Sequence, residues 1–223
     1  MEKPQFNPFD PHGEVQVYRR HLPHWRQQGA TYFVTFRLAD SIPATILLQW
    51  QEQRRLWLAA HGIHDSQPED ARQEKYLAIP ARERRRAERD EARRMHIELD
   101  RCHGSCLMRM EQNAEILQWT VLHFHGERGW IGDFTIMPNH VHLLVQPFAA
   151  HPLEKWLQTV KSYAARRFDK QVRKHDRVFQ QESYDRIVRN QEELSAYRRY
   201  IENNGAKAGL QPGEYRHHRC DWL

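Results

Sequence analysis

Apolar and polar side chains alternate along residues 30–40, where β-branched and aromatic residues predominate. This period of two is typical of a β-strand with one buried face. Two further apolar segments, 129–137 and 140–147, are separated only by Pro138 and Asn139, which favour a tight turn. The pattern therefore predicts one strand near the start of the chain and a β-hairpin in its middle.

Other segments repeat their apolar residues every three or four positions, as the buried face of an α-helix does. A short extended segment, 183–190, precedes the last of them, which is predicted to close at Asn204 and Gly205. The predicted helices cover residues 42–62, 111–126, 152–174 and 191–205.

Residues 42–109 differ from the rest of the chain in their polarity. Residues 63–80 are polar and are interrupted by Pro68 and Pro80, and the following twenty residues carry mixed charges at helical spacing. A segment this polar cannot bury a large face. We therefore interpret residues 42–109 as a mostly helical insertion that projects from the domain.

Without this insertion, the predicted order of elements is β-α-β-β-α-β followed by a helix. This order is the split β-α-β pattern of a ferredoxin-like fold. The sequence therefore predicts a single α+β domain over residues 1–223. Its antiparallel sheet is expected to carry helices on one face and the insertion after the first strand.

Composition narrows the class of protein. Of the 223 residues, 39% are hydrophobic and 28% are charged, so much of the chain must be solvated surface. No apolar run approaches the roughly 18 residues of a membrane span, and residues 1–13 lack the apolar stretch of a signal peptide. Three cysteines, an odd number, do not make a disulfide framework. We expect a cytoplasmic protein without a membrane partner.

The net charge of +5 is concentrated in one segment. Residues 151–200 contain 12 Lys and Arg against 7 Asp and Glu, whereas residues 1–150 contain 19 of each kind. A positive field of this kind favours a polyanionic partner, above all nucleic acid. A solvated helix face without any partner would give the same count, so charge alone leaves both interpretations open.

His140 and His142 occupy alternate positions in the second strand of the predicted hairpin. Both imidazoles therefore point to the same face and can share one divalent cation. Two core histidines would show the same spacing. A second pair, His123 and His125, provides a comparison, because residues two apart on a helix lie roughly 200° apart and cannot share an ion. We expect that second pair to be structural.

A hard cation such as Mg²⁺ or Mn²⁺ also needs oxygen ligands. Tyr200 and Asn204 are four residues apart on the last predicted helix and so lie on one face, with Tyr197 and Glu193 in the same row. A phenol and an amide oxygen facing two imidazoles would place a nucleophile beside a Lewis-acid metal, which suits displacement at a phosphoryl group. An ordinary, partly buried helix tyrosine is the alternative for Tyr200.

These residues lie in segments that resemble a known family. The motif "MPNHVHLLV" and, further along, "YIENNGAKAG" are similar to motifs of the REP-associated tyrosine transposases, bacterial single-tyrosine members of the HUH endonuclease superfamily. The upstream "YFVTFRLADSIP" and "ELDRCHGSCLM" also resemble blocks of this group, so the similarity spans most of residues 15–210. The chain departs at Gly205, where the family usually has proline, and we expect this change to loosen the helix end.

The resemblance implies that His140, His142 and Asn204 hold the metal and that Tyr200 is the nucleophile. It implies a transposase-like endonuclease that cleaves and joins single-stranded DNA at palindromic repeat hairpins, with Mg²⁺ or Mn²⁺ as cofactor. The intermediate would be a 5′-phosphotyrosine beside a free 3′-hydroxyl. The protein would act as a monomer or homodimer in the bacterial cytoplasm, associated with the nucleoid. Related transposases carry a tyrosine after a lysine on a helix, so Tyr163 is a rival nucleophile, although its place on the apolar stripe favours packing.

Recognition of single-stranded DNA calls for a basic groove. Each candidate cation for this groove could also be an ordinary surface charge: Lys155, Lys161, Arg166, Arg167, Lys170, Arg173, Arg186 and Arg189. Two other functions stay open. A hairpin-binding protein that has lost catalysis would bind DNA equally well without Tyr200. A metal phosphoesterase that uses water would release its product without a covalent adduct.

Overall fold

The computed structural model describes residues 4–19, 23–168 and 177–223. The chain divides into two compact units, one made of Met1–Ser41 and Ser105–Leu223, the other of Ile42–Gly104. None of the helices in the described part of the chain combines the length and the apolar composition that crossing a bilayer requires.

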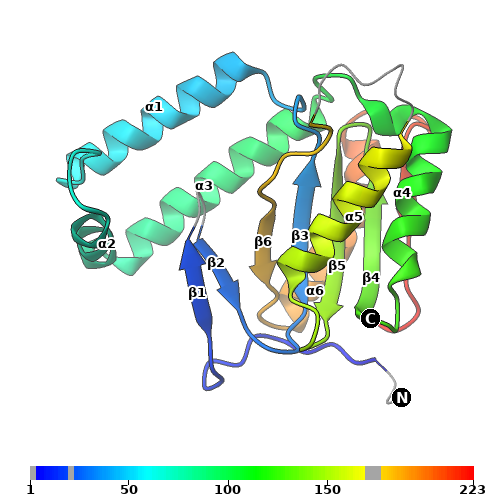
Figure 1. Ribbon diagram of the computed structural model, residues 1–223, viewed down its shortest axis with the longest axis horizontal. Coiled ribbons are helices and arrows are strands. Elements are labelled where there is room, and N and C mark those ends of the chain that lie inside the picture. The colour runs from blue at the N-terminus through cyan, green and yellow to red at the C-terminus, as the bar shows by residue number, and fades with distance from the viewer. Residues whose placement is uncertain (1–3, 20–22, 169–176) are drawn as a thin grey trace. The chain divides into compact units, whose positions relative to one another are not determined.

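The larger unit is built on a five-stranded antiparallel sheet (Figure 1). When the strands of this sheet are numbered by their order in the sequence, the first four lie side by side in the order 4-1-3-2, which is the order of the predicted ferredoxin-like fold. A short fifth strand is added at one edge. The second and third of these strands in the sequence form the predicted hairpin. Across the sheet, the strands are β6 (Tyr184–Ile187), β3 (Tyr32–Arg37), β5 (His140–Pro147), β4 (Gly129–Ile136) and β7 (Arg216–His218).

Helices cover both faces of this sheet. On one face, α4 (Glu111–His123) and α5 (Leu153–Arg167) pack against Val34 and its neighbours. On the opposite face, α6 (Gln191–Lys207) packs against Phe33. The prediction of helices on one face is therefore wrong. Consecutive residues of β3 are fully buried, so the strand has two apolar faces and each needs a cover.

Three predicted helix ends differ from the structure, and the first is that α4 ends at His123 rather than at Gly126. α5 ends at Arg167, because Phe168 is extended and buried rather than helical. α6 continues to Lys207, beyond the predicted end at Gly205. Gly205 does not make a left-handed turn. It allows close approach instead, since a Cβ there would lie 2.4 Å from the ring of Tyr215. The expected loosening at Gly205 is therefore not seen.

The smaller unit consists of three helices. A small core of Ile63, Tyr76 and Ile79 holds them together, with Trp57 packed against it. Each helix begins directly after a proline, whose fixed φ and missing N–H are tolerated at a helix start. Its helices are α1 (Ala44–Ala60), α2 (Glu69–Ala78) and α3 (Ala81–Asp100).

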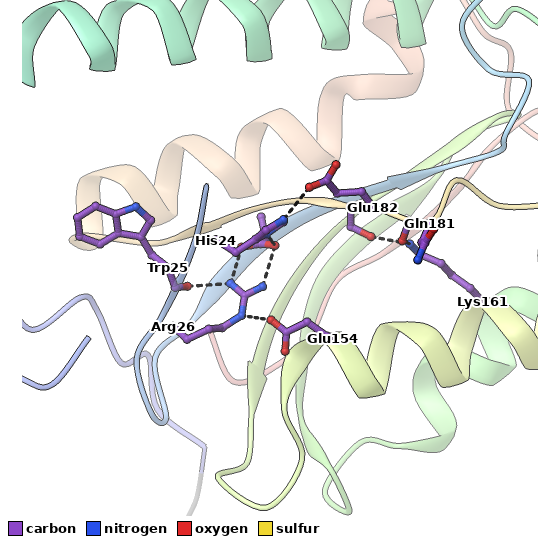
Figure 2. Close-up of polar contacts among 9 residues, drawn as sticks. His24, Trp25, Arg26, Glu154, Lys161, Gln181 and Glu182 are labelled. Carbon is purple, nitrogen blue, oxygen red and sulfur yellow. Dashed lines mark hydrogen bonds and ion pairs between the residues drawn. The ribbon is translucent and has the colours of Figure 1, made fainter. Parts of the chain in front are cut away.

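A second, two-stranded sheet and a short 3₁₀ helix complete the larger unit. The strands β1 (Gln16–Arg19) and β2 (Pro23–Arg26) form an antiparallel pair that the sequence pattern did not predict. The 3₁₀ helix η1 spans Leu107–Arg109. Two side chains of β2 point into a buried charge cluster: Arg26 binds Glu154 of α5, and His24 lies 3.0 Å from the carboxylate of Glu182 (Figure 2).

Candidate active site

The two histidines of β5 lie on the face of the sheet that α6 covers. His140 and His142 are both fully buried. Leu144, two residues further along the strand, packs in the core beneath α6, and side chains alternate along a strand. The Nε2 atoms of His140 and His142 are 3.0 Å apart. The two imidazoles therefore converge on one point, as their spacing predicted.

The other ring nitrogens have protein partners that fix the rings. Nδ1 of His142 lies 2.8 Å from Oγ1 of Thr35, and Nδ1 of His140 donates to Oδ1 of Asn139 at 2.7 Å. The Asn139 amide donates in turn to the carbonyl oxygen of Ser41. Because an amide oxygen only accepts, Nδ1 of His140 carries its proton and Nε2 offers a lone pair. Partners of this kind orient metal-binding histidines in many proteins.

The spacing of the two Nε2 atoms suits a shared cation. Nitrogen atoms about 2.1 Å from one ion, at roughly a right angle, are about 3 Å apart. Two facing lone pairs at that distance repel each other unless a proton or a cation lies between them. Neutral imidazoles on a buried strand are common ligands of divalent transition metals. His140 and His142 therefore fit a divalent cation.

Helix α6 brings Tyr200 to this point. Its Oη lies 3.2 Å from Nε2 of His142, and its ring meets Phe33 edge-on. Asn204 follows one helical turn later and is fully buried. Nζ of Lys207 lies 5.4 Å from the centre of the Tyr200 ring. From Tyr200 beside the histidines to its end at Lys207, α6 therefore carries a phenol, an amide and an ammonium.

The remaining predicted members of the row on α6 have other partners. Burial raises the pKa of Tyr197, whose ring stacks on Phe33 at 4.1 Å. Glu193 accepts from the backbone N–H of Arg189, while Asn190 accepts from the N–H of Glu193. Asn190 therefore caps the start of α6, and Glu193 binds the backbone of the residue before this cap. Tyr197 and Glu193 therefore support the helix rather than the histidine pair.

The other sequence candidates lie on the opposite face of the sheet. Tyr163, the rival nucleophile, is on α5, where it stacks on Trp119 and lies under the guanidinium of Arg167. His123 also stacks on Trp119, and Nδ1 of His125 accepts from the N–H of Ile131. His123 and His125 thus have different partners, as expected for residues two apart at a helix end.

Lys161, a predicted groove cation, is buried inside the larger unit. Its Nζ donates to the carbonyl oxygens of Gln180 and Gln181, both at 3.0 Å, and to Oγ of Ser183 at 2.7 Å (Figure 2). An ammonium has three protons, and all three are used here. Lys161 therefore braces the segment before β6 and is not an exposed groove cation.

The remaining groove candidates differ in exposure. Arg186 pairs with Glu193 at 2.9 Å. Lys170 and Arg173 lie outside the described residues. The exposed members are Lys155, Arg166, Arg167 and Arg189.

Several residues around the site were not predicted. Thr35 and Arg37 lie on β3, and only the strand register places them opposite His142 and His140. Burial lowers the pKa of the Arg37 guanidinium to about 10. Asn139 lies inside the histidine motif, so the sequence did offer a signal for it. The strand partners could not be identified without knowing which strands pair.

Part of the chain is similar to known transposases. A family model described as "Transposase IS200 like" matches residues 125–204, the segment that contains both histidines and Tyr200. A solved REP-associated tyrosine transposase bound to a REP hairpin is similar, with 13% identity and a TM-score of 0.44 over 92% of this chain and 93% of that chain. No curated protein matches the chain. The predicted resemblance to single-tyrosine transposases is therefore confirmed for residues 125–204.

Proposed function

We propose that the protein is a metal-dependent, single-stranded DNA endonuclease and strand transferase of the transposase type. One observation carries the proposal: Oη of Tyr200 lies 3.2 Å from Nε2 of His142, beside the converging imidazoles. A nucleophile next to a cation-binding pair is the arrangement that in-line displacement at phosphorus needs. The match of residues 125–204 to the IS200-like transposase family supports the same reaction.

The proposed metal ligands are His140, His142 and Asn204. The two Nε2 atoms supply the nitrogen ligands, and Asn204 supplies an amide oxygen of the kind that hard cations prefer. When bound, Mg²⁺ or Mn²⁺ would act as a Lewis acid that polarises a phosphoryl oxygen. All three side chains are fully buried.

In the proposed reaction, Oη of Tyr200 attacks the phosphorus and forms an O–P bond while the P–O3′ bond breaks. The electron pair of the broken bond stays on the 3′-oxygen, which takes up a proton, and the phenol proton leaves to solvent. The products are a 5′-phosphotyrosine and a free 3′-hydroxyl. Attack by a second strand's 3′-hydroxyl reverses the step and joins DNA without a nucleotide cofactor.

The substrate is proposed to be a DNA hairpin with single-stranded flanks. The choice of a hairpin follows the resemblance of the two motifs to the REP-associated tyrosine transposases. Exposed cations at Lys155, Arg166, Arg167 and Arg189 suit a nucleic-acid backbone.

The test is incubation with hairpin oligonucleotides and Mn²⁺, followed by denaturing electrophoresis. We expect a slowly migrating protein–DNA adduct with the native protein and with His123→Ala, which alters an exposed histidine on α4. Tyr200→Phe and His142→Ala should form none. Cleavage without an adduct would point to a water-using phosphoesterase, and binding without cleavage to a DNA-binding protein that has lost catalysis. Either result would contradict the proposal.

A further inference from the structure

Arg37 is the last residue of β3 and the register partner of His140 in β5. Its neighbours on alternate positions of the strand show which face it occupies. Phe33 packs in the core beneath α6, and Oγ1 of Thr35 lies 2.8 Å from Nδ1 of His142. Because side chains alternate along a strand, Arg37 lies on this face too. It therefore shares the sheet face of the candidate active site.

The Arg37 side chain is half-buried, and its guanidinium has only neutral partners. Its Nη1 donates to the carbonyl oxygen of Leu38 at 3.3 Å and to Oγ of Ser41 at 3.0 Å. Burial is the cause of its lowered pKa, and no carboxylate of the described chain acts on it. In the described part of the chain, both hydrogen bonds of the Arg37 guanidinium use Nη1. The edge formed by Nε–H and Nη2–H is therefore left for a ligand.

Other arginines of the larger unit with low exposure are paired with acids. Arg26, with 15% of its side chain exposed, binds Asp185 and Glu154. Arg198, with 20% exposed, binds Asp133 at 2.7 Å. Removing a cation from water without a partner is costly. An unbalanced charge that is kept at a cost to stability is typical of a functional site rather than of a structural one.

We propose that Arg37 binds the phosphate at which Tyr200 reacts, through Nε and Nη2. The identity of this anion, a phosphodiester of single-stranded DNA, rests on the proposed function. The fork of a guanidinium matches two phosphate oxygens. Negative charge builds on the non-bridging oxygens as the Oη–P bond forms, and a fixed cation beside them stabilises it. Ser41 and Leu38 hold the fork through Nη1.

A brace for residues 38–41 is the competing role, and stability separates the two. Arg37→Met removes the charge but keeps an unbranched side chain, while Arg37→Lys keeps a charge without the fork. Arg219→Gln is the control, because 65% of the Arg219 side chain is exposed and its ion pair lies at the surface. If Arg37 binds substrate, Arg37→Met should unfold at the same temperature as the native protein or higher.

Two further readouts complete the test. The rate of adduct formation with a hairpin oligonucleotide and Mn²⁺ should fall on the order of 100-fold in Arg37→Met. It should fall by about tenfold in Arg37→Lys and stay unchanged in Arg219→Gln. Inorganic phosphate should raise the unfolding temperature of the native protein and of the control, but not of Arg37→Met.

These readouts separate the inference from the proposed function. A native protein that forms no adduct, but whose stabilisation by phosphate depends on Arg37, contradicts the proposed function and supports the anion site. Adduct formation by Arg37→Met at the native rate overturns the inference. The inference is also overturned if phosphate stabilises the native protein and Arg37→Met equally, or stabilises neither of them. A fall of about 6 °C or more in the unfolding temperature of Arg37→Met would identify a brace and also overturn it.

Discussion

Oη of Tyr200 lies 3.2 Å from Nε2 of His142, and this contact joins α6 to β5 across one face of the sheet. The His142 ring is held independently of the tyrosine, because Thr35 binds its Nδ1 and the ring stacks on Phe33. Phe33 also meets the Tyr200 ring edge-on. The nucleophile and the histidine are thus positioned by the same strand, β3, before any ligand binds. Preorganisation of this kind is what a catalytic constellation requires.

Tyr200→Phe separates reaction from binding. Removal of the hydroxyl leaves the ring packing in place, so the free energy of unfolding should fall by about 1 kcal/mol or less. Adduct formation should fall on the order of 10⁴-fold or more, because the nucleophile is lost. Fluorescence anisotropy with a labelled hairpin should show affinity within about twofold of the native protein. A parallel loss of affinity and stability would instead indicate that Tyr200 is a packing residue.

The partners of the histidines should control metal affinity. Thr35→Val and Asn139→Ala remove the groups that hold the two Nδ1 atoms, and each should weaken Mn²⁺ binding by about 10- to 100-fold. Isothermal titration of the native protein gives the reference value. His123→Ala, at the exposed end of α4, should leave the affinity unchanged. Equal affinities in all four proteins would place the cation elsewhere.

The sheet and the histidine pair could be predicted because both follow from the period of two along a strand. The position of α6 could not be predicted, because a strand such as β3 with two apolar faces has the same pattern wherever its helices lie. The partners of the histidines depend on strand register, which one sequence does not reveal. Lys161 was misassigned because a buried lysine and a groove lysine look alike on a basic helix. What decides between them is the carbonyl cluster before β6.

Two lysines of α5 should therefore behave in opposite ways. Lys161→Met leaves the carbonyl oxygens of Gln180 and Gln181 without their donor and should lower the free energy of unfolding by about 2–3 kcal/mol. Lys155→Met alters an exposed residue and should leave that free energy unchanged. Its DNA affinity should fall, and the slope of log affinity against log salt should decrease by about 1. Denaturant titration and anisotropy measure the two effects, and a destabilised Lys155→Met with a stable Lys161→Met would contradict the assignment.

His24 should make stability depend on pH. Burial by itself lowers its pKa, but hydrogen bonds to Asp185 and Glu182 outweigh this and raise the pKa from 6.5 to about 9. The folded state therefore holds the proton more tightly than the unfolded state. The stabilisation is complete below pH 6.5 and is lost as pH rises through about 9. It amounts to about 3 kcal/mol.

The measurement is denaturant unfolding between pH 6 and pH 10, with His24→Gln as the control. The native protein should lose stability across this range more steeply than the variant, because the variant has no proton to lose at this site. The low pKa of Asp185 predicts a separate loss in acid, as the carboxylate becomes protonated. Parallel profiles for the two proteins above pH 6.5 would show that the cluster in Figure 2 does not hold a charged imidazole.

Peptide mapping of the covalent product tests the central claim most directly. After reaction with a hairpin oligonucleotide and Mn²⁺, nuclease and protease digestion leave one modified peptide for mass spectrometry. We predict a nucleotide phosphate on Tyr200, within the peptide that contains the end of α6. A nucleotide on Tyr163 or on another side chain, or an unmodified Tyr200 after complete cleavage of the DNA, would contradict the account.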